Sequence, residues 1–121
     1  MKELDIIIAH EHLNEVNSIL HKHQVGGMYF TPITGRGRYK KEEVEVLVGP
    51  DQYRTGKRYV PEFGGRTLVT IVVPDQMEKP IVDDILSKIS TGQLSDGKIF
   101  IKDIHEAYDI GTKASGDKAA L

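Results

Sequence analysis

Two polar segments that carry glycines contain the residue types that bind phosphate. The first runs from Thr91 to Phe100 and reads Thr-Gly-Gln-Leu-Ser-Asp-Gly-Lys-Ile-Phe. Glycine lets a backbone turn sharply and present its N–H groups to an anion, while Ser95 adds a hydroxyl and Lys98 a positive charge. The same composition fits an ordinary connection between a helix and a strand, so this segment alone does not establish a site.

The second segment, Gly35 to Lys41, places Arg36 and Arg38 beside glycines. Arginine presents a planar fork of donors that matches phosphate oxygens, and glycine allows the backbone to approach a ligand. Alone, this segment is better explained as a solvated turn. The two segments taken together favour an anion site.

Residue types for metal binding or catalysis are sparse. Histidines at positions 10, 12, 21 and 23 form two His-x-His pairs, but no carboxylate or cysteine pattern completes a tetrahedral site. We interpret them as a solvated helix face and expect no metal ion. The chain has no cysteine, and it offers no paired catalytic constellation beyond Lys98 and Asp96. A small enzyme is therefore the weaker hypothesis.

Length and charge limit the class of protein. A chain of 121 residues predicts one domain, residues 1–121, with a single core. The net charge of −2 gives no reason to expect a nucleic-acid partner. The apolar run after Met1 is short and holds charges, so it predicts neither a signal peptide nor a membrane span. We expect a cytoplasmic protein that reaches a membrane only through a partner.

Hydrophobic periodicity predicts which elements position these segments. We expect strands at Leu4–Ala9, Met28–Thr34, Arg66–Pro74 and Ile99–Ile104, and helices at Glu11–His23 and from about Asp75 to Ile89. Between Glu42 and Gly65 lies a long loop, in which Glu43–Val48 alternates like a further strand. Loops of this length in a small domain are generally functional or disordered. A polar tail, Ser115 to Lys118, is expected near the end of the chain.

Glycine, proline and aspartate predict where the elements end. Gly26 and Gly27 are expected to close the first helix in a left-handed conformation. Pro32 predicts either a strand at the edge of the sheet or a local irregularity in that strand. Asp75 followed by Gln-Met-Glu predicts a capping box for the second helix, whereas Pro80 suits only a first turn and argues for a later start.

The order of elements predicts an α+β protein with a ferredoxin-like β-α-β-β-α-β sheet and both helices on one face. The strands are apolar on both faces, so we expect the uncovered face to be buried by self-association.

Over essentially its whole length, the chain resembles the PII family of nitrogen-regulatory signal-transduction proteins. The resemblance rests on Val25–Met28, Gly35–Arg38, Ile71–Asp75 and, most specifically, Thr91–Phe100. In the family's terms, the T-loop covers about residues 37–65, the B-loop about 91–98 and the C-terminal loop about 105–121.

The resemblance implies a homotrimer with its sheets facing inward and adenine nucleotides in clefts between subunits. ADP or ATP is the implied ligand, with AMP as a further candidate. It also implies a non-enzymatic role, in which the T-loop contacts a membrane transporter or a metabolic enzyme. The implied nucleotide-binding residues are Ile7, Gly35, Arg36, Gly37, Arg38, Leu94, Ser95, Asp96, Gly97 and Lys98 from one subunit, and Gly27, Met28, Tyr29, Thr70 and Val72 from its neighbour.

Several positions depart from the family pattern. Thr70 stands where members carry a glutamate toward adenine, and Asp109 and Gly111 stand where the neighbour supplies two phosphate-binding arginines. The change at Thr70 concerns the choice of base, whereas the loss of the two arginines leads us to expect that ATP is less favoured relative to ADP or AMP than in typical members. Tyr39 replaces a glutamine that helps to hold magnesium, although Arg66 retains the basic residue that grips 2-oxoglutarate. Magnesium binding and the 2-oxoglutarate response are expected to be weak or absent.

The long loop also holds a candidate modification site. Tyr59 lies near the family's uridylylated tyrosine, although its flanking residues differ. Two alternative functions stay open. One is a trimeric interaction module that has lost nucleotide binding, motivated by Asp109 and Gly111. The other is an ordinary nitrogen sensor that responds to ATP and 2-oxoglutarate.

Overall fold

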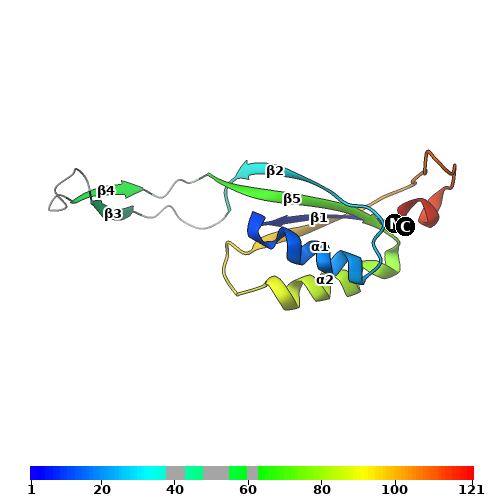
Figure 1. The fold of residues 1–121 in the computed structure, drawn as a ribbon, viewed down its shortest axis with the longest axis horizontal. Helices are drawn as coiled ribbons and strands as arrows, with labels where there is room; N and C mark the ends of the chain where they lie inside the picture. Colours follow the sequence, from blue (N-terminus) through cyan, green and yellow to red (C-terminus); the bar gives the residue numbers. More distant parts are fainter. Residues whose placement is uncertain (38–42, 48–54, 60–62) are drawn as a thin grey trace.

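The protein forms a four-stranded antiparallel sheet with two helices on one face (Figure 1). The computed structural model describes residues 1–37, 43–47, 55–59 and 63–121, with the backbone alone in the second and third of these ranges. The strands of the sheet are β1 (Lys2–Ile8), β2 (Tyr29–Gly35), β5 (Gly64–Val73) and β6 (Gly97–Asp103), in the spatial order β2-β5-β1-β6. The helices are α1 (Leu13–Lys22) and α2 (Asp75–Ile89). The predicted ferredoxin-like fold is confirmed.

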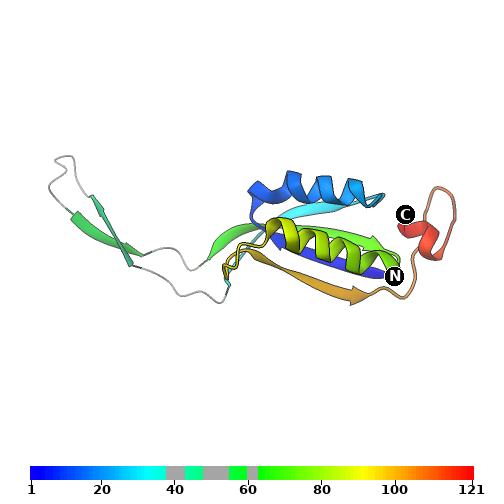
Figure 2. The ribbon, with the colours of Figure 1, turned by 90° about the horizontal axis from the view of Figure 1, so that it is seen from below.

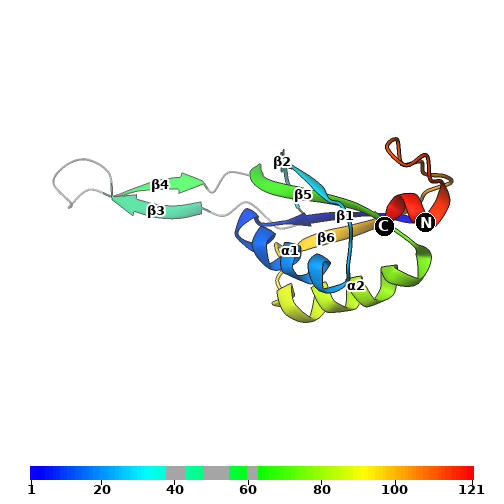
Figure 3. The same ribbon diagram turned by 45° about the vertical axis from the view of Figure 1, so that its right-hand side comes forward.

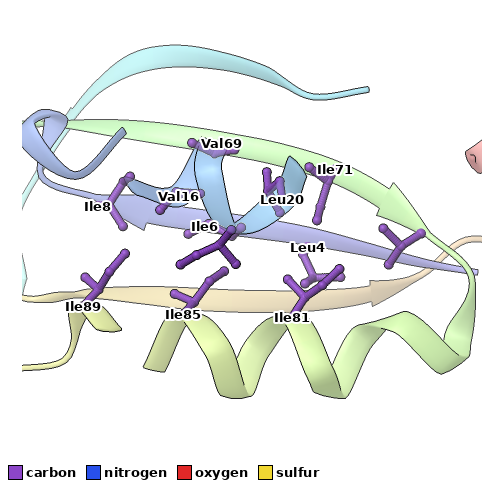
Figure 4. Packing of buried hydrophobic residues seen from close by; sticks show 12 residues of the cluster. Leu4, Ile6, Ile8, Val16, Leu20, Val69, Ile71, Ile81, Ile85 and Ile89 are labelled. Atoms are coloured by element: carbon purple, nitrogen blue, oxygen red, sulfur yellow. The ribbon is translucent and has the colours of Figure 1, made fainter. Parts of the chain in front are cut away.

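The core lies between the sheet and the two helices, which run side by side on the same face (Figure 2). In β1 and β5 every second residue of the central stretch is apolar and buried, so the two central strands present one apolar surface to the helices. The helices fill this surface from a stripe of residues with helical spacing (Figure 4). The core residues are Leu4, Ile6, Ile8, Val16, Ile19, Leu20, Val69, Ile71, Val73, Ile81, Ile85 and Ile89.

The end of α1 differs from its prediction. Gln24, not a glycine, takes the left-handed conformation, with φ of 60°. The N–H of Val25 donates to the carbonyl of Leu20 and that of Gln24 to His21, both at 3.0 Å, which closes the helix. Gly26 is needed for another reason, because a Cβ there would lie 2.4 Å from the carbonyl carbon of Leu121. The prediction that Gly26 and Gly27 end the helix was wrong.

The start of α2 also differs. The residue before the helix is Pro74, and Asp75 makes no capping hydrogen bond to the helix backbone. Its carboxylate instead binds the amino group of Met1 at 2.9 Å. Pro80 lies inside the helix, where its missing N–H removes one backbone hydrogen bond. Both the capping box and the later start were therefore wrong.

The long loop contains a hairpin of β3 (Glu43–Leu47) and β4 (Thr55–Tyr59), which lies beyond the ends of β2 and β5 (Figures 1 and 3). The alternation at Glu43–Val48 predicted β3. β4 was not predicted, because Gly56, Lys57 and Arg58 favour a turn or a solvated strand more than a buried one. Arg38 and Tyr39 lie outside the described residues.

The sheet ends and the C-terminal segment complete the fold. β2 pairs with β5 alone among the described strands, so Pro32 lies on an edge strand as predicted.

The segment after β6 is more ordered than the expected polar tail, because Tyr108 pairs with Ser115 and a short 3₁₀ helix covers Gly116–Ala120. In the part of the chain that the structure describes, no helix has the length and apolarity to cross a membrane.

Candidate functional site

The face of the sheet opposite α1 and α2, which we call the uncovered face because no helix of the described residues lies on it, carries both polar and apolar side chains. Strand register places Lys98 of β6 opposite Ile7 of β1, which in turn lies opposite Leu68 of β5. The next row aligns Phe100, Asp5 and Thr70 in the same way. Because the side chains of paired residues share one face, Lys98 lies at the open end of an apolar row.

The loop between α2 and β6 approaches this row through Gly97. Its φ is +133°, and a Cβ at this position would lie 2.0 Å from the carbonyl oxygen of Ile7. Glycine is therefore required here both by conformation and by space. Gly92, at the other end of the loop, has φ of +85°, and a Cβ there would meet nothing within 4 Å. The loop thus begins and ends on glycines in positive-φ conformations.

A cavity of about 350 Å³ lies where this loop, β1, β6 and the ends of β2 and β5 meet. Three basic residues, Arg36, Arg66 and Lys98, line it from three different segments. The remaining lining residues are Ile7, Ile33, Gly35, Gly37, Leu94, Ser95, Gly97 and Phe100. We call this cavity the cation pocket. Its volume lies within the range of about 300–1,000 Å³ that is usual for small-molecule sites.

A larger cavity of about 580 Å³ lies on the opposite side of the loop, against α2 and β6. Apolar side chains line most of it, including Ile85, Leu86, Ile89 and Ile101. Ile7, Gly97, Lys98 and Phe100 border both cavities. The smaller cavity gathers the arginines and the glycine-rich backbone in one place, an arrangement that suits an anion.

The cation pocket brings together eight of the residues that the sequence singled out. They are Ile7, Gly35, Arg36, Gly37, Leu94, Ser95, Gly97 and Lys98. Asp96 borders the larger cavity instead, and Arg38 lies outside the described residues. The five residues expected from a neighbouring subunit, Gly27, Met28, Tyr29, Thr70 and Val72, border neither cavity of the single chain.

Sequence reasoning missed Ile33 and Phe100 as lining residues. Phe100 lies two positions after Lys98, and Ile33 two positions before Gly35, so each shares a strand face with a predicted residue. The period of two along a strand was the available signal. Arg66, predicted only as a 2-oxoglutarate contact, also lines the pocket, where its guanidinium donates to the carbonyl of Gly65 at 2.8 Å.

A charged network lies farther along the uncovered face. Lys102 contacts the carboxylate of Asp5 at 3.0 Å and that of Glu3 at 3.4 Å, and the hydroxyl of Thr70 donates to Asp5 at 3.3 Å. Partial burial raises the pKa of Asp5, but the hydrogen bonds, led by that from Lys102, outweigh it and hold the pKa below its usual value. The hydroxyl of Thr70 is therefore hydrogen-bonded within the sheet, and only 4% of the residue's surface is exposed.

Asp109 is also engaged within its own segment. Its carboxylate accepts the N–H of Thr112 at 3.0 Å, and this hydrogen bond lowers the pKa of Asp109. The side chain therefore supports the turn that follows Tyr108. Beside it, Ile110 is almost fully exposed, at 97%. Among the described residues, no group of three or more histidines, cysteines and carboxylates could hold a metal ion.

Comparison with known proteins gives consistent matches along the chain. The family model described as nitrogen regulatory protein P-II matches residues 1–114. The nitrogen regulatory protein P-II 2 of Methanothermobacter thermautotrophicus is 37% identical over 119 residues, covering 98% of this chain and 96% of that protein. The nitrogen regulatory protein P-II 1 of Escherichia coli is 33% identical, covering 98% of this chain and 99% of that protein.

Two further comparisons agree. The nitrogen fixation nifHD region GlnB-like protein 2 of Methanobacterium ivanovii is 32% identical, and the match covers both chains completely. The solved structure of GlnK from B. subtilis superposes with a TM-score of 0.71 at 19% identity, covering 98% of this chain and 96% of that chain. At this identity, the structural match supports the fold.

Proposed function

The chain belongs to the P-II family of nitrogen regulatory proteins, and from that premise we propose that it binds an adenine nucleotide and regulates a partner without catalysing a reaction. ADP or ATP is the proposed ligand, and AMP is a further candidate. The proposed partner is a membrane transporter or a metabolic enzyme, contacted through the T-loop.

The cation pocket is the observation that carries this proposal. Arg66 of β5, Lys98 of β6 and Arg36, the residue after the end of β2, converge there. Gly97 brings loop backbone against β1, where a side chain would not fit. Cationic donors beside glycine-rich backbone suit a phosphate chain, and Ile7 and Phe100 supply the apolar surface that a nucleotide also needs.

The uncovered face of the sheet supports a homotrimer whose sheets face inward. Tyr29 and Phe100 on this face are 65% and 51% exposed in the single chain. Leu68, Val72 and Ile33 on the same face are only partly buried. Apolar surface of this kind favours association, and a second copy would bring Gly27, Met28 and Tyr29 toward a neighbouring pocket.

The proposed ligand preference follows from two residues that a neighbouring subunit would bring to the pocket. Asp109 and Gly111 supply no cation at the positions where related proteins are expected to have arginines, which weakens contacts to an outer phosphate. We therefore propose a sensor of adenylate energy state in which ADP competes well with ATP. The 2-oxoglutarate response and magnesium dependence are proposed to be weak or absent.

Calorimetric titration tests this function directly. AMP, ADP and ATP are titrated separately, each with and without magnesium and 2-oxoglutarate. We expect ADP and ATP to bind with similar affinity and 2-oxoglutarate to change neither affinity much. Strong enhancement of ATP binding by 2-oxoglutarate would establish the ordinary nitrogen sensor. Absence of binding by all three nucleotides would establish a nucleotide-independent module, and steady turnover would establish an enzyme.

A further inference from the structure

The carboxylate of Asp96 closes the loop that borders the cation pocket. Its Oδ2 accepts the backbone N–H of Thr91 at 2.6 Å and that of Gln93 at 3.3 Å. Its Oδ1 accepts the hydroxyl of Thr91, also at 2.6 Å. The N–H of Asp96 in turn donates to the carbonyl of Gln93 at 3.2 Å. We call the contacts between Thr91 and Asp96 the loop clasp.

The hydrogen bonds of the loop clasp stabilise the Asp96 carboxylate in its charged form. The hydroxyl and the N–H of Thr91 are the principal causes that lower the pKa of Asp96 below its usual value. An ionised carboxylate only accepts hydrogen bonds, so it needs the donors that Thr91 and Gln93 provide. The same group borders the apolar cavity beside α2, on the other side of the loop from the three basic residues of the cation pocket.

The clasp and Gly97 fix the two ends of the loop. At Gly97 the backbone lies directly against the carbonyl of Ile7 in β1. At Thr91, just after α2, the clasp ties the chain back to Asp96. Leu94 and Ser95 lie between these two points and line the cation pocket. Their position toward a ligand therefore depends on both restraints.

We propose that the carboxylate of Asp96 is a positioning group for the nucleotide site, which holds Leu94, Ser95 and Gly97 against the cation pocket through Thr91 and does not itself contact the ligand. The inference rests on the proposed function. The positioning role and simple electrostatics predict opposite changes in nucleotide affinity when Asp96 is removed. A carboxylate near a phosphate site repels the ligand, so charge alone predicts that removing Asp96 tightens nucleotide binding. Positioning predicts that its removal weakens binding.

The first experiment measures ADP affinity by calorimetry at fixed ionic strength. Asp96→Ala is expected to weaken binding about tenfold, because the loop loses the restraint given by three hydrogen bonds to the charged carboxylate. Thr91→Val removes the clasp hydroxyl without any change of charge and is expected to weaken binding in the same direction. Thr91→Ser retains the hydroxyl and should bind like the wild type. Asp103→Ala removes an exposed carboxylate near the far end of β6 and serves as the charge control.

The second experiment needs no nucleotide. Carbon-13 NMR of the free protein follows the Asp96 carboxyl during an acid titration. Its midpoint is expected below the ordinary value of about 3.9, and Thr91→Val should move it upward. In a wild type that binds ADP, tighter or unchanged binding by Asp96→Ala and Thr91→Val would overturn the positioning role alone. An ordinary Asp96 midpoint would do the same. Failure of the wild type to bind any adenine nucleotide would overturn the proposed function and the positioning role with it.

Discussion

Lys98 stands at the start of β6, where its side chain borders both the cation pocket and the larger apolar cavity. Charge-assisted hydrogen bonds contribute about 1.5–3 kcal/mol each. Lys98→Ala is therefore expected to weaken AMP, ADP and ATP by roughly 10- to 100-fold and to leave the oligomeric state unchanged, as measured by calorimetry and light scattering. Lys79→Ala, on the exposed side of α2, is the matched control for loss of one positive charge. Equal nucleotide affinity in the two variants would contradict the assignment of the pocket.

Gly97 is the residue whose replacement the backbone tolerates least. A Cβ there would meet the carbonyl oxygen of Ile7 at 2.0 Å, and its φ of +133° is rare for other residues. Gly97→Ala is expected to lower the free energy of unfolding by at least about 1–3 kcal/mol, as measured by urea denaturation. Gly65→Ala is the control, because its Cβ would meet nothing within 4 Å. A similar, small effect of both substitutions would show that the strand pair relaxes around Gly97.

At the scale of the element, the two helices are joined by Asp84 of α2. Its carboxylate accepts from His23 at 2.9 Å and from Lys22 at 3.2 Å, at the end of α1, and lies 3.7 Å from Lys88. The hydrogen bond from His23, followed by that from Lys22, lowers the pKa of Asp84. The side chain is mostly buried between the helices, with 11% of it exposed.

The lowered pKa of Asp84 predicts how the stability of the protein depends on pH. A carboxyl group whose pKa is lowered on folding stabilises the protein above its unfolded pKa, which is about 3.9. That stability is lost as the pH falls through the lower, folded pKa. Asp84→Asn is therefore expected to reduce stability at pH 6 and to flatten its decline below about pH 4. Urea unfolding at constant protein concentration measures both effects.

Asp83→Asn provides the control on the same helix, because Asp83 is 59% exposed and forms an ion pair with Lys79 on its own helix. It should change the stability little at either pH. An acid decline that is the same in Asp84→Asn and in the wild type would show that Asp84 does not link the helices energetically.

Among the helices and strands, the sequence predicted the buried face well where buried and exposed residues recur at regular spacing. It misled where a residue such as glycine is required by a contact that is distant in sequence. Val16, Ile19 and Leu20 have the spacing of one helical face, and they are the buried residues of α1. The glycines after it misled, because Gly26 is required by Leu121, a contact that is distant in sequence. Leu86 fits the helical stripe of α2, yet it is 53% exposed and borders a cavity.

The candidate site shows the same limit. The glycine-rich loop and the arginine segment were recognisable by composition, and the structure places most of them around one pocket. The role of Asp96 was not recognisable, because its pairing with Thr91 depends on how the loop turns back on itself. The composition of the loop suggested that Asp96 lies near a phosphate. In the structure, its carboxylate instead accepts hydrogen bonds from the loop backbone.

At the scale of the whole molecule, the uncovered face of the sheet predicts self-association. Leu68 lies near the middle of this face, between Ile7 and Thr31 in the register of the sheet. Leu68→Arg would bury an unpaired charge in the proposed interface, so we expect it to dissociate the trimer. Light scattering should give a mass of three times 13.5 kDa for the wild type and 13.5 kDa for the variant.

Gln76→Arg introduces the same charge on the exposed part of α2 and should leave the trimer intact. A wild type that is monomeric at all concentrations would contradict the assembly. If Leu68→Arg were also trimeric, the contacts between subunits would have to lie elsewhere. Circular dichroism of each variant verifies that the fold itself is retained.

The segment that holds the β3–β4 hairpin leaves the sheet at Gly35 and re-enters it at Gly64, two residues that face each other in the register of β2 and β5. Gly35 and its neighbours Arg36 and Gly37 also line the cation pocket, as does Arg66 on the other side. The hairpin thus connects to the sheet next to residues that line the cation pocket. Because binding free energies are reciprocal, any factor by which a ligand in this pocket changes the affinity for a partner on the hairpin must equal the factor by which that partner changes the affinity for the ligand.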